Sequence, residues 1–322
     1  MTHPTTRFDL DQAVEDHRRE LTGYCYRMLG SGSEAEDAVQ ETLVRAWKAA
    51  DRFEGRSSVR SWLYRIATNV CLDMHRSPQR RARPMSFGGP TRVEDAVLNE
   101  RPEETWVQPI ADASVLPEDG DPAEVAATRE SIRLAFVAAL QHLPARQRAA
   151  LILCEVLRWP AAEVAELLDT SVASVNSALQ RARATLASAD GPTLDSPLDP
   201  AHQVLLQRYV DAFERYDMSA LAALLREDVV MSMPPWDLWL QGPESVVGWM
   251  VGPGAACEGS RLVPIALNGT AGFGSYKQVA PGRWEPWGIQ VIEVADGRIV
   301  GHHNFIYPHL FDQLGLPPHL EA

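Results

Sequence analysis

A proline-rich, acidic stretch, residues 77–122, most constrains how this chain can fold. Its sequence is SPQRRARPMSFGGPTRVEDAVLNERPEETWVQPIADASVLPEDGDP. Proline lacks a backbone N–H and fixes φ, and the acidic, glycine-containing composition disfavours a packed core. We therefore interpret the stretch as an extended linker between separately folded segments.

The segments on either side of this stretch have the apolar periodicity of helices only, over roughly 9–76 and 123–188. A second short linker, ADGPTLDSPLDP, covers 189–200. The remainder begins with a helix and continues as short β-type runs, two of which are separated by Asp296-Gly297, a strong hairpin signal. This order predicts a multi-domain chain with two all-α domains followed by an α+β domain, a curved sheet with helices on one face.

Charge is distributed unevenly along the chain. The net charge is −13, yet residues 45–83 hold 10 basic and 3 acidic side chains. Residues 91–125 hold 2 basic and 10 acidic side chains. Because local charge sets the affinity for phosphate, a nucleic-acid partner is compatible with an acidic protein.

Several classes of protein are disfavoured by what the sequence lacks. No apolar run approaches the ~20 residues that span a bilayer, and the first residues have no apolar leader segment. The four cysteines are far apart and form no CxxC pair. We expect reduced thiols, a cytoplasmic location, no membrane partner, no metal site and no cofactor.

The helix expected over 34–50 has a core stripe and an opposite polar face. At 100° per residue, Ala35, Val39, Leu43 and Ala46 fall together. Asp37, Gln40, Glu41, Val44 and Lys48 fall on or near the other side. Acids, an amide and a bare valine suit docking onto a basic partner surface, although a merely solvated face has the same pattern.

The next helix, within RFEGRSSVRSWLYRIATNVCLDMHRSPQRRARP, is predicted to expose Tyr64 between Arg60 and Arg65. An exposed tyrosine can stack on a base while arginines hold phosphates. Further on, Pro160 starts a short helix, and Ser171 is placed to cap a second helix after a turn at Asp169-Thr170. This layout is typical of a helix-turn-helix whose small, polar outer face would let the helix enter the major groove closely, although an ordinary helical hairpin uses the same caps.

Taken together, ELTGYCYRMLGSGSEAEDAVQETLVRAW, RSSVRSWLYRIATNVCLDMHR and LPARQRAALILCEVLRWPAAEVAELLDTSVASVNSALQRARATL resemble a bacterial RNA polymerase sigma factor of the extracytoplasmic-function (ECF) group. Residues 201–322 resemble a SnoaL-like domain, which is a cone-shaped fold. The stretches that carry this resemblance include YVDAFERYDMSALAALLREDVVMSMPP and GRIVGHHNFIYPHLFDQLGLP. The domains implied are sigma region 2 over 9–83, an acidic linker over 84–122, sigma region 4 over 123–188, a linker over 189–200 and a SnoaL-like regulatory domain over 201–322.

The resemblance implies a function and partners. The chain would bind core RNA polymerase, through the clamp helices of the largest subunit and the flap, and would direct it to promoter DNA. The polymerase would be bound by Asp37, Gln40, Glu41, Val44 and Lys48. The −10 element would be bound as a single strand by Arg56, Arg60, Ser61, Tyr64, Arg65, Asn69 and Arg76. The −35 element would be bound by Ser171, Ser174, Asn176, Ser177, Gln180 and Arg181.

The SnoaL-like resemblance implies intramolecular regulation of the sigma domains by 201–322. Trp106, in a Trp-x-x-Pro element of the linker, is the expected contact with this domain. Asp237, Trp287, His302 and His303 are candidates for a ligand pocket or a domain contact. Adjacent residues of a strand point to opposite faces, so only one of the two histidines can line a cavity.

Two other functions use the same features. One is a helix-turn-helix regulator that senses a small molecule through the third domain. The other is a cyclase- or isomerase-like enzyme fused to DNA-binding helices, although no spacing of residues specifies a reaction. A repressor needs no −10-binding domain, so Asp37-x-x-Gln40-Glu41 and RSWLYRIATN count against it. We therefore expect a sigma factor and not an enzyme.

Overall fold

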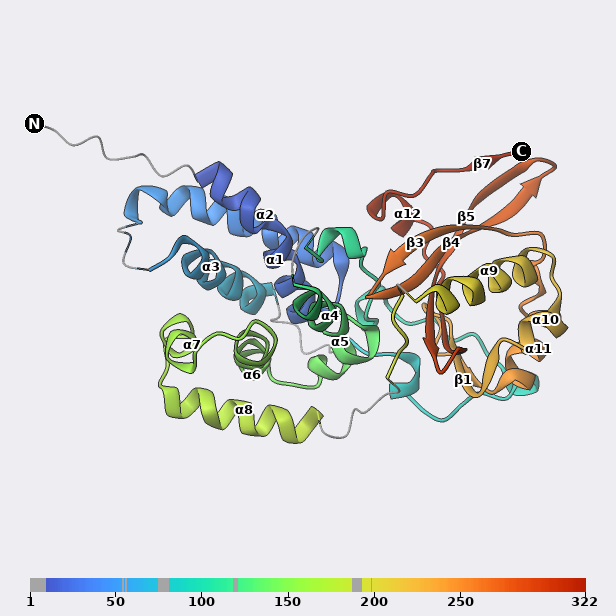
Figure 1. The fold of residues 1–322 in the computed structure, drawn as a ribbon, viewed down its shortest axis with the longest axis horizontal. Coiled ribbons are helices and arrows are strands. Elements are labelled where there is room, and N and C mark those ends of the chain that lie inside the picture. Colours follow the sequence, from blue (N-terminus) through green and yellow to red (C-terminus); the bar gives the residue numbers. More distant parts are fainter. Residues whose placement is uncertain are drawn as a thin grey trace, which may run out of the picture. The chain divides into compact units, whose positions relative to one another are not determined.

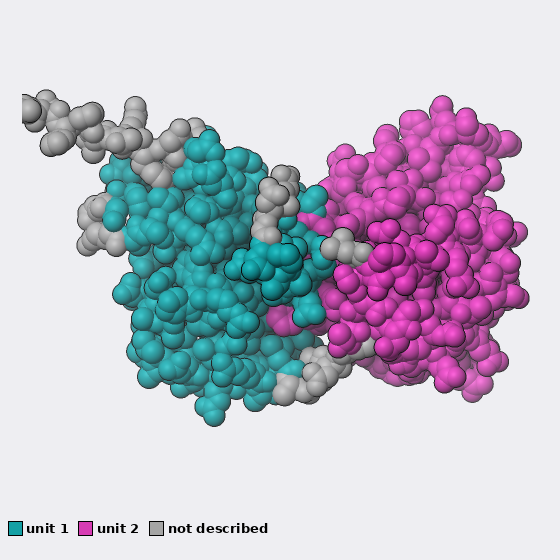
Figure 2. Space-filling view, in the orientation of Figure 1, with its two compact units in different colours: residues 1–78, 113–131, 139–188 teal, residues 79–112, 132–138, 189–322 magenta. Residues whose placement is uncertain are grey.

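The computed structural model describes residues 10–53, 55, 57–74, 81–117, 121–186, 193–197 and 199–322. The chain divides into two compact units (Figure 2). The N-terminal unit contains 1–78, 113–131 and 139–188, and the C-terminal unit contains 79–112, 132–138 and 189–322. The expected all-helical first part and sheet-containing last part are both present.

The N-terminal unit opens with helices α1 (Leu10–Leu29), α2 (Gly32–Ala49) and α3 (Val59–Met74), which pack on one another (Figure 1). The one-turn 3₁₀ helix η1 (Ala50–Arg52) follows α2. Ser31 caps α2, because its hydroxyl accepts a hydrogen bond from the backbone N–H of Glu34 at 3.3 Å. Leu21, Val39 and Leu63 are among the buried side chains of this bundle.

The second helical part ends in a helix-turn-helix. The elements are α4 (Pro122–Glu130), α5 (Leu134–Gln141), α6 (Ala145–Leu151), the π-helical turn η6 (Ile152–Val156), α7 (Ala161–Leu167) and α8 (Val172–Leu186). Asp169, with φ +50°, makes the turn between α7 and α8. The Ser171 hydroxyl accepts from the Ser174 N–H at 3.2 Å and so caps α8. Val175, Leu179 and Ala182 form the buried side of α8.

Two buried arginines tie these helices together. The guanidinium of Arg148, on α6, donates to the carbonyl oxygens of Met28 on α1 and of Leu143, the latter at 3.1 Å. It also donates to the side-chain oxygen of Gln141 at 2.6 Å. Arg27, on α1, donates to the Ser131 hydroxyl at 2.6 Å. Burial lowers the pKa of Arg27 to about 10, which leaves it charged at neutral pH.

The C-terminal unit is built on one sheet. Its strands are β1 (Leu225–Ser232), β2 (Trp239–Gln241), β3 (Arg261–Leu267), β4 (Thr270–Ala280), β5 (Arg283–Ala295), β6 (Arg298–Phe305) and β7 (Leu320–Glu321). The order is β2-β1-β6-β5-β4-β3, with β7 on β5. β1 and β6 run parallel, whereas every other pair is antiparallel.

Helices complete this unit and close its core. They are α9 (Pro200–Glu214), α10 (Met218–Ala222), α11 (Pro243–Val251) and α12 (Leu310–Gln313), with the short 3₁₀ turn η7 (Ala255–Cys257). Side chains of α9 and α11, such as Leu205 and Val246, share one core cluster with Met231 and Ile292 of the sheet. The Asp296-Gly297 turn joins β5 to β6 with both φ values positive, as the hairpin prediction requires.

The proline-rich segment differs from the extended linker that its composition predicts. Residues 79–112 belong to the C-terminal unit and contain 3₁₀ turns η2 (Pro84–Ser86), η3 (Val93–Asp95) and η4 (Glu103–Thr105); η5 (Asp112–Ser114) follows. Backbone pairing explains the difference, because Ala111 bridges Leu267 and Glu100 bridges Trp236. The edge strand β3 and the loop between β1 and β2 thus supply backbone partners to the segment from distant parts of the chain.

Candidate functional site

The outer face of α2 carries the five residues that the sequence assigns to polymerase binding. Asp37, Gln40, Glu41, Val44 and Lys48 are all exposed. Glu41 accepts a hydrogen bond from Arg45 at 2.7 Å, and Arg45 also pairs with Asp73 of α3 at 3.0 Å. The face is therefore a mixed polar surface whose acids are partly held by a neighbouring arginine.

Sequence reasoning missed one residue of this face. Trp47 lies three residues after Val44 and is 62% exposed, and Val44 is 43% exposed. Large exposed aromatic side chains are unusual on a solvated helix and are enriched at protein interfaces. Trp47 follows Val44 by three residues and Gln40 by seven, and residues at these spacings share one face of a helix. This spacing could have identified it from the sequence.

The prediction that Tyr64 is exposed is wrong. Its side chain is fully buried, and its ring lies edge-on to Tyr24 of α1 at 5.2 Å between centroids. On its other side the ring of Trp159 lies 4.9 Å away. Because α3 packs against both α1 and the segment after η6, the position of Tyr64, which a single-helix projection leaves to solvent, is covered.

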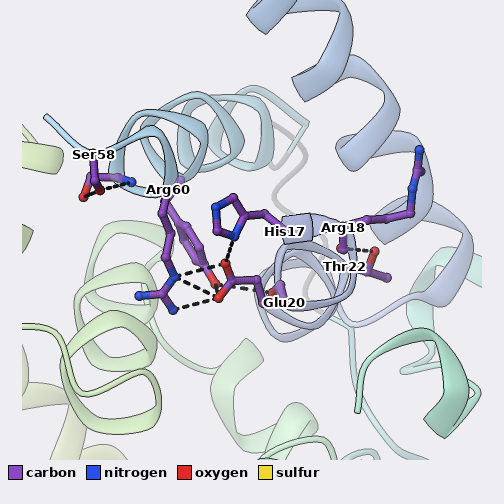
Figure 3. Close-up of polar contacts among 8 residues, drawn as sticks. His17, Arg18, Glu20, Thr22, Ser58 and Arg60 are labelled. Carbon is purple, nitrogen blue, oxygen red and sulfur yellow. Dashed lines mark hydrogen bonds and ion pairs between the residues drawn. The ribbon is translucent and has the colours of Figure 1, made fainter. Parts of the chain in front are cut away.

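The arginines of α3 are also engaged. Arg60 forms a two-pronged ion pair with Glu20, with Nη2 2.7 Å from Oε2, and Glu20 also lies 2.6 Å from Nδ1 of His17 (Figure 3). The Arg60 guanidinium stacks 5.0 Å from the ring centroid of Trp159. Arg65, which is exposed, donates to the backbone carbonyl of Glu166 on α7 at 3.2 Å.

The other residues assigned to −10 DNA are placed variously. Asn69 is exposed, and Ser61 is half-buried with its hydroxyl 2.8 Å from that of Ser58. Arg56 and Arg76 lie outside the described residues. Trp62, which the sequence argument did not use, is half-buried and stacks at 4.9 Å on Phe53. Trp62 is therefore more accessible than Tyr64, which is fully buried.

The outer face of α8 carries the residues assigned to the −35 element. All six are exposed: Ser171, Ser174, Asn176, Ser177, Gln180 and Arg181. Val172, which the periodicity places in the buried stripe, is instead 43% exposed at the start of the helix. A branched apolar group there has the character of side chains that contact thymine methyl groups.

The C-terminal unit contains a cavity of about 170 Å³ whose lining includes four aromatic and three methionine side chains. Trp287 and His302 line it, whereas His303 does not. The two histidines therefore point to opposite sides of β6, as strand geometry predicts. His302 Nε2 lies 3.0 Å from the hydroxyl of Tyr209, which donates to Gln290 at 2.7 Å.

Asp237 and His303 contact the proline-rich segment instead of the cavity. Asp237 forms an ion pair with Arg101 at 3.0 Å. His303 lies 2.8 Å from Nη2 of Arg83, 2.9 Å from the Ser232 hydroxyl and 3.3 Å from Glu293. His303, on β6, and Asp237, in the loop between β1 and β2, thus join the C-terminal unit's sheet and loop to the proline-rich segment.

Trp106 is fully buried within this segment. Its backbone pairs with Ala82, and its ring lies edge-on to Phe87 at 5.6 Å. Arg81 donates to its carbonyl oxygen at 2.8 Å. The backbone of Trp106 therefore joins residues 81–82 to a later part of the same segment, and its buried ring packs within the segment.

Burial sets the ionisation of the groups around β6. It lowers the pKa of His302 to about 3, with a contribution from neighbouring His303, and it lowers the pKa of His303 as well. Burial alone would raise the pKa of Glu293, but the charge and hydrogen bond of His303, with Arg83, lower it to about 2. His302 is therefore neutral at physiological pH, whereas Glu293 is ionised.

This ionisation predicts that acid destabilises the C-terminal unit. The unfolded chain binds a proton at His302 below about pH 6.5, whereas the folded chain does not until about pH 3. The contribution is fully present above pH 6.5 and is lost as pH falls, by about 2 kcal/mol for His302 at pH 5. In His302→Gln the amide can still bond Tyr209. Between pH 7 and pH 5, we expect the free energy of unfolding of this variant to fall by about 2 kcal/mol less than that of the wild type.

Urea unfolding followed by tryptophan fluorescence measures this difference, since six of the nine tryptophans lie in the C-terminal unit. Glu293 does not disturb the comparison, because its ordinary pKa of about 4.5 lies below this window. His319→Gln changes an exposed histidine and is the control. Equal pH dependence in the His302 variant and the wild type would contradict the prediction.

Neither a metal centre nor a membrane segment is found in the described part of the chain. No group of three His, Cys, Asp or Glu side chains there could hold a metal ion. No helix there is long and apolar enough to cross a bilayer.

Three family models match the chain in succession. Sigma-70 region 2 matches residues 13–81, Sigma-70, region 4 matches 133–186, and the SnoaL-like domain matches 206–302. The first two cover α2, α3 and α8, and the third covers most of the sheet.

Two proteins of Mycobacterium tuberculosis (strain ATCC 25618 / H37Rv) are similar over nearly the whole chain. ECF RNA polymerase sigma factor SigG is 41% identical over 319 residues, which is 98% of this chain and 85% of SigG. ECF RNA polymerase sigma factor SigJ is 26% identical over 315 residues, which is 91% of this chain and 90% of SigJ. The crystal structure of SigJ matches with a TM-score of 0.59 at 25% identity, covering 96% of this chain and 99% of that one.

Proposed function

The chain belongs to the ECF RNA polymerase sigma factors, and from this premise we propose how its surfaces act in transcription initiation. Sigma factors bind core RNA polymerase and direct it to promoters. The observation that carries the proposal is the coexistence of the exposed α2 face, which includes Trp47 near the end of the helix, and the exposed polar face of α8. The first suits a protein partner and the second a major groove.

We propose that the α2 face, Asp37, Gln40, Glu41, Val44, Trp47 and Lys48, binds the clamp helices of the polymerase largest subunit. Acidic and amide groups complement a basic surface, and the two exposed apolar side chains supply buried area. The flap is the expected partner of the second helical part.

Promoter DNA is proposed to bind α3 and α8. On α8, Gln180 and Arg181 have the reach and chemistry for base edges and phosphates. On α3, single-stranded DNA has to displace the contacts of Arg60 with Trp159 and of Arg65 with Glu166. The free chain therefore holds Arg60, Tyr64 and Arg65 in internal contacts, and Tyr64 can stack on a base only if Trp159 moves away.

The C-terminal unit is proposed to regulate these activities within the chain. Residues 81–112 are docked on its sheet and the adjoining loop by Arg83, Arg101 and Trp239, the last donating to the Gly88 carbonyl at 3.0 Å. Sigma factors act by binding and not by catalysis, so a regulatory role for the cone is favoured over an enzymatic one. We also propose that the many acids of this segment mimic nucleic-acid charge in a basic polymerase channel.

Run-off transcription with core polymerase on promoter DNA tests the function. We expect the full chain to stimulate promoter-specific transcripts, and Gln180→Ala with Arg181→Ala to lower them at −35-dependent promoters. A helix-turn-helix repressor or a DNA-bound enzyme would give no stimulation, and that outcome would discard the proposal.

The proposed regulation by the C-terminal unit is tested by exchanging the two charges of one ion pair in the full chain. Arg101→Asp or Asp237→Arg alone breaks their ion pair and loosens the docked segment, whereas the double variant restores an ion pair of opposite orientation. We expect transcription to change several-fold in each single variant and to return toward wild type in the double variant. Unchanged transcription in both single variants would refute regulation through this docking.

A further inference from the structure

The cavity of the C-terminal unit lies between the sheet and the helices that cover it. Its wall is formed by aromatic and thioether side chains, among them Phe213, Trp249, Trp287 and Met231. Its volume, about 170 Å³, is close to that of a cavity that accepts a benzene ring. The sheet and helices thus border a partly open space suited to a single-ring molecule.

One end of the cavity is polar. Tyr209, buried behind it, bonds both Gln290 and His302, which orders these two side chains as part of the cavity wall. Ser275, which also lines the cavity, is 2% exposed, and its hydroxyl has no hydrogen-bond partner among the described residues. A buried hydroxyl without a partner costs free energy, and a ligand oxygen would remove that cost.

None of the described residues that line the cavity is an acid, a lysine or an arginine. Neutral His302 adds no charge, so an ionised ligand would lose its hydration without a counter-charge. We propose that the cavity binds an uncharged, single-ring molecule of the phenol class, with the ring against the tryptophans and the oxygen bonded to Ser275. This site goes beyond the proposed recruitment of polymerase, and only its regulatory effect rests on that function.

The proline-rich segment forms part of the same cavity. Leu98, which belongs to this segment and is 46% exposed, lines the cavity. Trp236, from the loop between β1 and β2, lines it as well. Glu100 bridges Trp236, and the Asn99 carbonyl accepts from the N–H of Asp237 at 3.1 Å. A bound ring therefore contacts the docked segment directly, and we infer that binding stabilises its docked position.

Calorimetric titration of the full chain with phenol, toluene and benzoate tests the site. We expect phenol to bind, toluene to bind about 2- to 10-fold more weakly for lack of one neutral hydrogen bond, and benzoate not to bind measurably. Ser275→Ala should reduce the affinity for phenol to that for toluene. Ser260→Ala is the matched control, because this serine is equally buried and unpartnered among the described residues but does not line the cavity.

Two readouts locate the ligand. Cys257 lines the cavity and is half-buried, so phenol should slow its alkylation several-fold, as peptide mapping would show. Phenol should also slow tryptic cleavage after Arg92, which is exposed in the docked segment. Absence of saturable phenol binding, or equal binding by the Ser275 variant, would overturn the site. Unchanged cleavage at Arg92 would overturn the coupling to the segment, and neither result depends on transcription.

Discussion

Arg148→Met is expected to lower the free energy of unfolding of the N-terminal unit by about 3–5 kcal/mol, because each buried acceptor left without a donor costs about 1–3 kcal/mol. Arg148 is fully buried, and its guanidinium bonds carbonyl oxygens of Met28 and Leu143 as well as the side chain of Gln141. Methionine fills a similar volume but donates no hydrogen bond, so these oxygens remain buried without a donor. The first helical bundle and the second helical part lose their shared polar clamp.

Urea unfolding followed by circular dichroism measures this loss. Arg181→Met, on the exposed face of α8, is the matched control and should change stability by less than about 0.5 kcal/mol. Arg148→Lys keeps the positive charge but lacks the several N–H donors of a guanidinium. Its loss of unfolding free energy should lie between those of Arg148→Met and Arg181→Met. A loss below about 1 kcal/mol in Arg148→Met would show that the clamp does not hold the unit together.

Trp47→Ala is expected to weaken binding to core RNA polymerase by about 10- to 30-fold, the effect of losing an aromatic hot spot. Trp47 is the most exposed large aromatic side chain among the described residues, and it adjoins Val44 on the proposed clamp-binding face. Because it is exposed, the substitution should leave the folding stability nearly unchanged. Run-off transcription should fall at low sigma concentration and recover at saturating concentration.

Fluorescence anisotropy of labelled sigma factor titrated with core polymerase measures the affinity. Val204→Ala is the control, since Val204 is also 62% exposed but lies on α9 of the C-terminal unit. It should leave the affinity unchanged. A Trp47 variant with wild-type affinity would remove this residue from the polymerase interface and leave the function itself standing.

Local patterns predicted those features that depend on neighbours in sequence. The 100° periodicity of α2 separates buried Ala35 and Val39 from exposed Asp37 and Glu41. Positive φ values at Asp296-Gly297 and alternation along β6 likewise follow from short-range geometry. The domain types, the fold class and the sigma family followed from motifs in a fixed order.

The failures concern residues whose surroundings come from elsewhere in the chain. Periodicity left Tyr64 on the open side of α3, but Trp159, 95 positions later, covers it. No pattern around Ser275 in the sequence indicates that its hydroxyl lines a cavity without a hydrogen-bond partner among the described residues. Such facts depend on which distant elements pack together.

The sequence by itself determined the helical and sheet segments, the outward faces of α2 and α8 and the family. These depend on backbone geometry and on side-chain spacing within a few turns or strands. Only the tertiary structure decided that residues 79–112 dock on the sheet, that α3 keeps its arginines in internal contacts, and that Leu98 and Ser275 line one cavity. The physical reason is that an unpaired backbone group or an apolar surface accepts any complementary partner, and the pairing actually formed is settled by the packing of the whole unit.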